Sequence, residues 1–268
     1  MMKWLSLPAL AATLAALLLA AVDERVILRR YTVETEKLSS PVRMAVLSDL
    51  HGNDYGQDGL QLLALLIKEQ PDAILMTGDM FSPDGDASEE LAFFRHLAEI
   101  APSFYVTGNH EYAEYSISSL TREIRQTGVT VLNKNCVTLS IRGQTVNICG
   151  IPDPVSGSSA KASINALDIP GEGYTVLLSH RPELIDQYAA SGAFDLVLCG
   201  HAHGGQVRIP LLINGLYAPN QGLFPQYAGG RYTLDGTTMI VSRGLAREQQ
   251  WYIPRVFNRP ELVIVTIE

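Results

Sequence analysis

Short apolar runs, each followed by polar residues, set the pattern of this chain. They are typical of buried strands, because they are compact, rich in Val, Ile and Leu, and bounded by glycine or polar residues. The runs lie at 42–48, 72–77, 103–107, 174–179 and 194–199.

Segments with a helical pattern separate these strands. They cover 59–70, a stretch from Asp86 to about 100, 116–126 and 182–190, and most end near a glycine or a proline. The alternation predicts parallel strands joined by right-handed crossovers. Further strands are expected at a sheet edge (26–33), as short pieces within 129–151, and at 237–242 and 262–267 near the end of the chain.

The chain is long and apolar enough for one large core. It has 268 residues, of which 47% are hydrophobic and 18% are charged, so we predict a single α/β domain over 23–268 behind an N-terminal segment of 1–22. The formal net charge of −8 argues against a nucleic-acid partner held by bulk positive charge. The irregular stretch 210–231 is rich in Gly, Pro and aromatic residues, which is typical of a functional loop.

The N-terminal segment carries a different signal. From Trp4 to Val22 the chain is apolar, interrupted by Ser6, Pro8 and Thr13, and its length approaches the ~20 residues that a helix needs to cross a bilayer. A membrane anchor and a cleaved signal peptide both fit this stretch. We predict the anchor, because the exit lacks a clear small-x-small cleavage site, and we expect a membrane-associated protein whose main domain lies outside the cytoplasm.

The three cysteines give no sign of a disulfide framework. Cys136, Cys149 and Cys199 are odd in number and not closely spaced. Cys149 and Cys199 end strand-like runs, so we expect small buried hydrophobic residues there rather than thiolate metal ligands.

Side chains that bind metals follow the predicted strands one after another. His201 and His203 stand two apart after the last run, so an extended backbone points both to the same side, and Asp49 and His51 repeat this spacing. Sites in α/β sheets form outside the carboxyl ends of the strands. Carboxylate, amide and imidazole ligands suit borderline divalent ions such as Mn²⁺, Fe²⁺ or Zn²⁺. The complete set is Asp49, His51, Asp79, Asn109, His110, His180, His201 and His203.

Together these motifs resemble the metallophosphoesterase (calcineurin-like phosphoesterase) superfamily. Asp-x-His, Gly-Asp, Gly-Asn-His-Glu, a single His and Gly-His-x-His occur in the family's order over residues 42–205. The resemblance implies a four-layer α/β/β/α sandwich of two mixed sheets. Gly204, Gly205 and Gln206, with the N-terminal apolar segment, resemble the membrane-associated bacterial phosphodiesterase branch.

The resemblance also implies a centre for two divalent metal ions. Two such ions clamp the attacking and leaving oxygens of an in-line displacement and acidify a shared water, so hydroxide is available near neutral pH. A histidine beside them would then give a proton to the leaving group. By position, the implied ligands of one ion are Asp49, His51 and His203, those of the other are Asn109, His180 and His201, Asp79 bridges both, and His110 stays unligated beside the leaving group.

The implied function is hydrolysis of phosphodiesters or pyrophosphate-linked molecules near a membrane, with lipid-linked or envelope-derived phosphoesters as substrates. A phosphomonoesterase or protein phosphatase is an alternative, and so is a metal-stabilised scaffold, although such scaffolds usually lose ligands and this chain keeps them all. The family often has an Asp three residues after the bridging one, which helps to orient the unligated histidine. Here that position is Ser82, so Asp84 or Glu111 would have to take this role.

Substrate contacts are predicted close to these motifs. Asn53 and Tyr55 follow the Asp-x-His motif closely enough to line the cleft, and Arg243 and Arg247 follow a late strand, from which they would reach a substrate phosphate. Surface arginines without such a role are the alternative. Apolar residues of 210–231 would form a pocket for a lipid-linked substrate or touch the membrane, with ordinary packing under the loop as the other reading.

Overall fold

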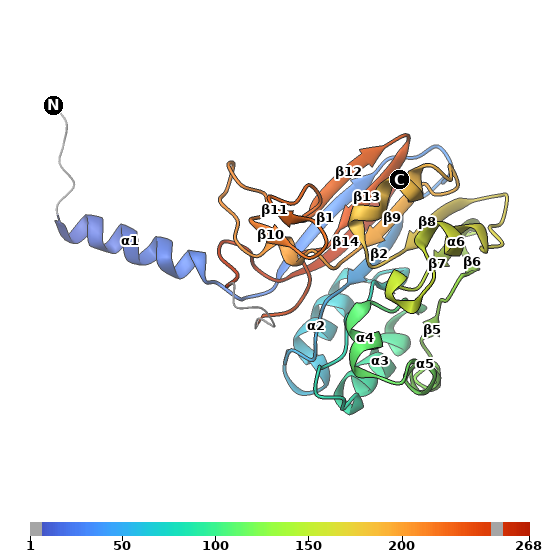
Figure 1. The fold of residues 1–268 in the computed structure, drawn as a ribbon, viewed down its shortest axis with the longest axis horizontal. Helices are drawn as coiled ribbons and strands as arrows, with labels where there is room; N and C mark the ends of the chain where they lie inside the picture. Colours follow the sequence, from blue (N-terminus) through green and yellow to red (C-terminus); the bar gives the residue numbers. More distant parts are fainter. Residues whose placement is uncertain (1–6, 248–253) are drawn as a thin grey trace.

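Two six-stranded sheets form the centre of the molecule, with helices on their outer faces (Figure 1). The computed structural model describes residues 7–247 and 254–268 of the chain. Apolar runs of the sequence become strands because each fills a buried position in one of these sheets.

The first sheet contains the strands predicted in the first half of the chain. Its order is β1-β14-β2-β3-β4-β5. Neighbours from β2 to β5 are parallel, as predicted, whereas β14 runs antiparallel to β2. The expected edge strand is confirmed, because among the described strands β1 lies at the edge of the sheet and pairs with β14 alone. The bounds are β1 Ile27–Val33, β2 Val42–Leu47, β3 Ala73–Met76, β4 Ser103–Tyr105, β5 Thr130–Val131 and β14 Glu261–Ile267.

The second sheet is built from the middle of the chain. Its order is β12-β13-β9-β8-β7-β6. The inner strands are parallel to one another, and an antiparallel partner closes each edge. The bounds are β6 Asn135–Ile141, β7 Gln144–Gly150, β8 Tyr174–Leu178, β9 Leu196–Cys199, β12 Gly230–Leu234 and β13 Thr237–Val241.

The helices that cover the two sheets fall into two groups. One group lies on the side of the first sheet (Figure 1) and comprises α2 Leu60–Glu69, α3 Ser88–Ile100, α4 Asn109–Glu114 and α5 Ile117–Gln126. The other packs on the second sheet and comprises α6 Ala160–Asn165 and α7 Ile185–Ala189. Short 3₁₀ turns η1 Gln57–Gly59, η2 Pro154–Ser156, η3 Pro182–Leu184 and η4 His203–Gly205 and a small hairpin of β10 Tyr217–Ala218 and β11 Gly222–Leu223 complete the fold.

Side chains alternate between two cores along each central strand. In β2, Met44 and Val46 lie in the core between the sheets, which also contains Val176 of β8. Their neighbours Ala45 and Leu47 lie in the core beneath α2, α3 and α5. A third core separates the second sheet from α6 and α7. Three apolar layers between four layers of secondary structure make the α/β/β/α sandwich of two mixed sheets that the resemblance implied.

The expectation that the cysteines form no disulfide is wrong for one pair. Cys136 and Cys149 face each other directly across the β6–β7 hairpin and are joined by a disulfide. They lie 13 residues apart in sequence, so it is the strand register that brings them together. Cys199 is free and buried, as expected.

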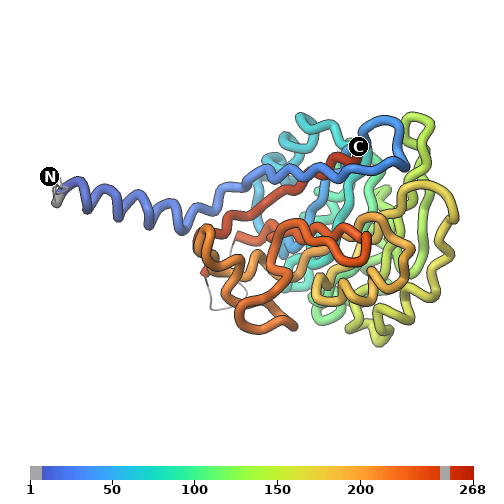
Figure 2. The backbone as a smooth tube through the Cα atoms, turned by 90° about the horizontal axis from the view of Figure 1, so that it is seen from above, coloured from blue at the N-terminus to red at the C-terminus, as the bar shows by residue number. Residues whose placement is uncertain are grey.

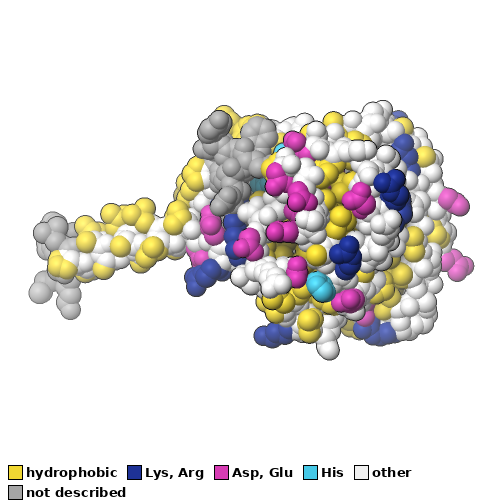
Figure 3. Space-filling view, turned by 90° about the horizontal axis from the view of Figure 1, so that it is seen from below, with side chains coloured by type: hydrophobic (Ala, Val, Ile, Leu, Met, Phe, Trp, Pro, Cys, Tyr) yellow, Lys and Arg dark blue, Asp and Glu magenta, His cyan; other side chains and the backbone are white. Residues whose placement is uncertain are grey.

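Helix α1 (Leu7–Ala21) extends away from the two sheets (Figures 1 and 2). The leucines from Leu10 to Leu19 are exposed, for example Leu18 at 61% and Leu19 at 73%, and hydrophobic side chains run along the visible face of the helix (Figure 3). At its end, Ala21 O accepts a hydrogen bond from Phe257 N at 2.7 Å. Within the described residues, no helix combines the length and apolarity that crossing a membrane requires, and residues 1–6 of the predicted anchor lie outside them.

Candidate metal centre

The predicted ligands meet where strands of both sheets end. Asp49 and His51 follow β2, Asp79 follows β3, and His201 and His203 follow β9. The backbone N–H of His201 donates to both carboxylate oxygens of Asp49, at 3.0 and 3.1 Å. This contact joins the end of the second sheet to the end of the first, so one pocket receives side chains from both.

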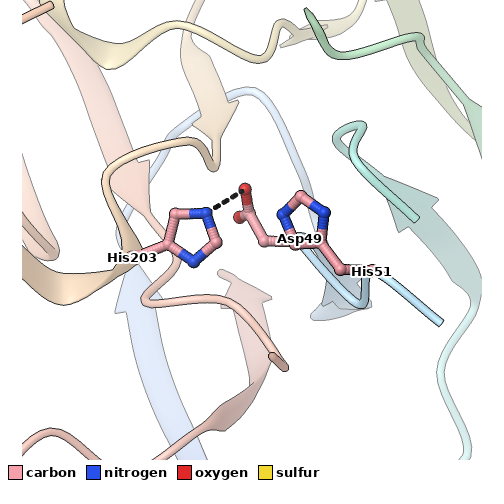
Figure 4. Close-up of side chains that lie close together, drawn as sticks. All are labelled: Asp49, His51 and His203. Atoms are coloured by element: carbon pink, nitrogen blue, oxygen red, sulfur yellow. Dashed lines mark ion pairs between the residues drawn. The ribbon is translucent and has the colours of Figure 1, made fainter. Parts of the chain in front are cut away.

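The first group of potential ligands is Asp49, His51 and His203 (Figure 4). One ligand atom from each lies within 4.8 Å of the others, and all three residues are buried. His203 Nε2 lies 3.6 Å from Asp49 Oδ1. The imidazoles of His51 and His203 stack with their centroids 5.2 Å apart. This arrangement presents a carboxylate and two imidazoles to one point, as the sequence predicts for the first ion.

The second group is Asp79, His180 and His201, which meets the same distance limit. His180 Nε2 lies 3.0 Å from Asp79 Oδ2 and 3.1 Å from His201 Nδ1. On the far side of its ring, His180 Nδ1 lies 2.7 Å from the carbonyl oxygen of Thr77. A carbonyl acceptor fixes the proton on Nδ1 and so leaves Nε2 free to bind a metal.

Asp79 lies between the two groups. Its Oδ2 is 3.0 Å from His180 Nε2 and 3.9 Å from His51 Nε2. With His51 and His110 it also forms a third potential ligand group. Its other oxygen, Oδ1, accepts the backbone N–H of His110 at 2.9 Å. Asp79 therefore occupies the position that a ligand shared by two ions requires.

Several buried polar atoms of the site have no hydrogen-bond partner among the described residues. They are His51 Nδ1 and Nε2, Asn109 Oδ1 and His110 Nδ1. Unpaired buried polar atoms are costly and rare in folded proteins. Divalent ions would satisfy the His51 imidazole and the Asn109 amide oxygen, and the carboxylate, amide and imidazole donors suit borderline metals. The residues present therefore fit a metal centre.

Burial also prepares the imidazoles for metal binding. Burial lowers the pKa of His51 to about 4 and lowers the pKa values of His201 and His203 well below the usual range. These rings are therefore neutral near pH 7, which is the form that binds metals. Burial opposes protonation of His180 as well, but the adjacent Asp79 carboxylate raises the pKa of His180 to about 10. A metal cation bound to His180 in place of that proton would likewise balance the negative charge of Asp79.

The ligand loops hold an unusual backbone conformation. Asp49, His51, Asp79, His201 and His203 have φ values of 50°, 49°, 52°, 68° and 47°. This left-handed region is unfavourable for residues other than glycine and is maintained where the surroundings demand it, often at functional sites.

Glu111 holds two of these loops together. Its carboxylate is buried and accepts the backbone N–H groups of Asp79 at 3.1 Å, Met80 at 2.8 Å and Gly108 at 2.7 Å. In the sequence, Glu111 is a candidate for orienting His110. In the structure its bonds go instead to the backbone of the Asp79 loop and of the residue before Asn109.

Residues around His201 were missed by the sequence reasoning. His201 Nε2 lies 2.8 Å from Asn220 Oδ1, an acceptor for the Nε2 proton, which leaves Nδ1 facing His180. Arg181 Nη1 lies 3.2 Å from the same nitrogen, and its guanidinium is held by Asp153 at 2.5 and 3.0 Å. The available hints were that Arg181 directly follows a ligand and that Asn220 lies in the irregular segment 210–231.

The predicted substrate residues lie in two places beside the ligands. Asn53 accepts the backbone N–H of Arg247 at 2.8 Å. Tyr55 is buried, donates to Leu245 O, and carries the Arg247 guanidinium 3.9 Å above its ring. Arg243 points elsewhere, with Nε 3.4 Å from Glu261 Oε2. Contact of these residues with substrate stays a prediction.

Such a sandwich, with buried carboxylates and imidazoles gathered where both sheets end, is the architecture of a metal-dependent hydrolase. The chain belongs to the calcineurin-like phosphoesterase family, whose sequence profile matches residues 42–205. It is therefore a hydrolase of phosphoester bonds, as the sequence predicts.

Similar proteins cover most of the chain. Phosphodiesterase YaeI of Escherichia coli K12 is 26% identical over 235 residues, which are 85% of this chain and 83% of that protein. An uncharacterized metallophosphoesterase of Aquifex aeolicus is 29% identical over 253 residues, 89% of this chain and 90% of that protein. The solved structure of an archaeal phosphodiesterase has a TM-score of 0.43 and 12% identity, covering 80% of this chain and 91% of that one.

Proposed function

We propose that this protein is a metal-dependent phosphodiesterase that works at a membrane surface. The observation that carries the catalytic part is the position of Asp79 between two buried groups of ligands. Two metal ions, when bound, supply Lewis acidity and an activated water for hydrolysis. The preference for diesters is supported by the similarity to a protein named as a phosphodiesterase.

The side chains divide into ligands and a proton donor. When bound, one ion would be held by Asp49, His51 and His203 and the other by Asn109, His180 and His201, with Asp79 available to both. His110 lies beside this pair, with its ring 4.7 Å from that of His51 and its Nδ1 buried without a partner among the described residues. Because this nitrogen is not engaged in a hydrogen bond within the described protein, the His110 imidazole is available to give a proton to the leaving oxygen of the substrate.

Hydrolysis of bis-p-nitrophenyl phosphate with added Mn²⁺ tests the catalytic part. Wild type is expected to cleave the diester faster than p-nitrophenyl phosphate and to contain two ions per chain by mass spectrometry. Asp79→Asn should lose most of the activity and most of the bound metal, whereas Asp168→Asn, at an exposed carboxylate, should retain both. Equal rates for wild type and Asp79→Asn on both substrates would refute hydrolysis at this site. A faster monoester reaction would favour the phosphatase alternative, and bound metal without turnover the scaffold.

The membrane part rests on the N-terminus. Residues 4–22 are apolar, and α1 leaves its leucines exposed instead of packing them on the sheets. Exposed apolar surface of this extent is unfavourable in water and favourable in a bilayer. After cell fractionation, the full chain should stay in the membrane pellet through an alkaline carbonate wash. Release by that wash, or a mature protein that begins after residue 22, would refute the anchor.

A location outside the cytoplasm is supported by the disulfide between Cys136 and Cys149, because disulfides persist mainly in oxidising compartments. Alkylation of free thiols in denatured whole-cell extracts should then label Cys199 alone. Labelling of all the cysteines would argue for the cytoplasm.

A further inference from the structure

A cavity that none of the metal-centre ligands lines plays no part in the chemistry above. Its volume is about 370 Å³, within the usual range of small-molecule sites. It lies between the turn at 209–213 and two arginines, Arg208 and Arg243, with Phe257 as a further wall. We call it the arginine pocket.

The two guanidinium groups of the arginine pocket approach the same point. A Cβ atom built on Gly229 would lie 3.6 Å from both Arg208 Nη1 and Arg243 Nε. Among the described residues, Arg208 makes no ion pair, and its guanidinium donates to the uncharged Gly204 O and Asn214 Oδ1. Like charges held this close favour the arrival of an anion.

Among the described residues, the negative charge beside these cations is smaller than their positive charge. Fully buried Glu261 lies 3.4 Å from Arg243 Nε and 3.6 Å from Arg29 Nε, so one carboxylate serves two arginines before Arg208 is counted. Burial, and then the charge of Arg243, lower the pKa of Arg208 to about 10. Arg208 remains protonated at neutral pH, and the group keeps a positive excess that suits a phosphate, which guanidinium groups bind well.

The remaining wall of the pocket is apolar and faces solvent. Leu211 and Leu212 are 105% and 81% exposed, and Ile209 is 41% exposed. They belong to a tight turn in which Ile209 pairs with Ile213, so the turn itself holds the leucines outward. An anion without an apolar part would leave this surface in water.

The pocket lies at the end of the molecule from which α1 emerges. Phe257, which lines the pocket, donates its backbone N–H to Ala21 O at the end of α1. Two views at right angles place the segment around residues 209–224 close to the point where α1 leaves the body (Figures 1 and 2). A bilayer that receives α1 therefore lies next to the leucines of the turn.

We propose that the arginine pocket binds the phosphate of an anionic membrane lipid, with the lipid's acyl part against Leu211, Leu212 and Phe257. Lipid binding here builds on the membrane location proposed above but requires no hydrolysis. It would give the protein a second contact with the membrane in addition to α1. Membrane attachment through one apolar segment becomes much more stable when a second contact is added.

The test measures binding of short-chain lipids to the full-length protein in a non-ionic detergent with EDTA, by calorimetry. Dihexanoylphosphatidylglycerol should bind at least tenfold more tightly than dihexanoylphosphatidylcholine or inorganic phosphate. Arg208→Gln should weaken this binding at least fivefold. Leu212→Asp, at a side chain too exposed to be needed for folding, should do the same. Arg125→Gln, at an exposed arginine on α5, is the matched control and should bind normally.

Asp79→Asn separates this site from the metal centre. It should lose phosphodiesterase activity yet bind phosphatidylglycerol as wild type does. If Asp79→Asn loses lipid binding while Arg208→Gln and Leu212→Asp keep it, the lipid occupies the metal centre and the arginine pocket is no lipid site. Binding of inorganic phosphate as tight as that of the lipid, or unchanged lipid binding in both pocket variants, would also overturn the inference.

Discussion

Replacing Glu111 by Gln tests whether this carboxylate holds the metal-binding loops in place. Glu111 Oε2 accepts the N–H groups of Asp79 and Gly108, and Oε1 accepts that of Met80. Glutamine has one carbonyl oxygen and one amide NH₂ group, and the NH₂ group repels a backbone N–H. If the amide oxygen takes the place of Oε2, Met80 loses its acceptor. In the opposite orientation, Asp79 and Gly108 lose theirs.

The cost follows from the better of these two orientations. One buried N–H left without an acceptor costs about 1–3 kcal/mol, and the two bonds that remain lose the help of a full charge. We therefore expect Glu111→Gln to lower the free energy of unfolding by roughly 2–4 kcal/mol. Because the Asp79 loop is then held less firmly, metal affinity should also fall, on the order of tenfold or more, as for other outer contacts of metal ligands.

Two measurements check this expectation. Urea denaturation in EDTA gives the stability of the metal-free protein, and chelator competition gives the metal affinity. Glu114→Gln is the matched control, because Glu114 is an exposed glutamate of the same helix. Metal-free stability within about 0.5 kcal/mol of wild type, with unchanged metal affinity, would show that Glu111 does not organise the loops.

Three further predictions address other parts of the molecule. Asn220→Ala removes the acceptor of the His201 Nε2 proton, so metal affinity should fall about tenfold by chelator competition, and an unchanged value would refute this role. Cys136→Ser opens a disulfide across 13 residues and should cost about 3 kcal/mol in urea denaturation; a smaller loss than that of an exposed Ser→Ala change would contradict it. Burial raises the pKa of Glu90 from 4.5 to about 7, so the folded state binds the Glu90 proton more tightly, and the contribution of Glu90 to the free energy of unfolding should fall as pH rises from about 4.5 to about 7. Glu90→Gln should remove this contribution, so that between these pH values the free energy of unfolding, measured by urea denaturation, changes less unfavourably than in wild type. An equal slope in both proteins would exclude a contribution from Glu90.

Much of the site was predictable, because most metal ligands directly follow an apolar run that forms a strand. Apolar runs at 42–48 and 194–199 predicted β2 and β9, and the residues after them predicted a pocket where strands end. Period-two spacing pointed to Asp49 with His51, which share a ligand group. The extended backbone assumed for His201 and His203 is wrong, because both have left-handed φ values and they lie in different ligand groups. Parallel strands end at a common edge, so the sequence required only the fold class to bring these groups together.

What could not be predicted depends on register and on contacts between distant loops. Cys136 meets Cys149 only because the hairpin places these two positions opposite each other. Asn220 reaches His201 from the irregular segment 210–231. That segment has no periodic pattern of apolar residues from which its path could be predicted. Glu111 was recognised as important, but its partners are backbone N–H groups, which no residue type reveals.

The bond from His201 N–H to the Asp49 carboxylate crosses the seam between the two sheets. Metal cations bound there would have ligands from both sheets and would therefore crosslink the first sheet to the second. Chelation should then speed the opening of the whole sandwich as well as stop turnover, so the supply of metal to the newly made chain would set how long each molecule survives.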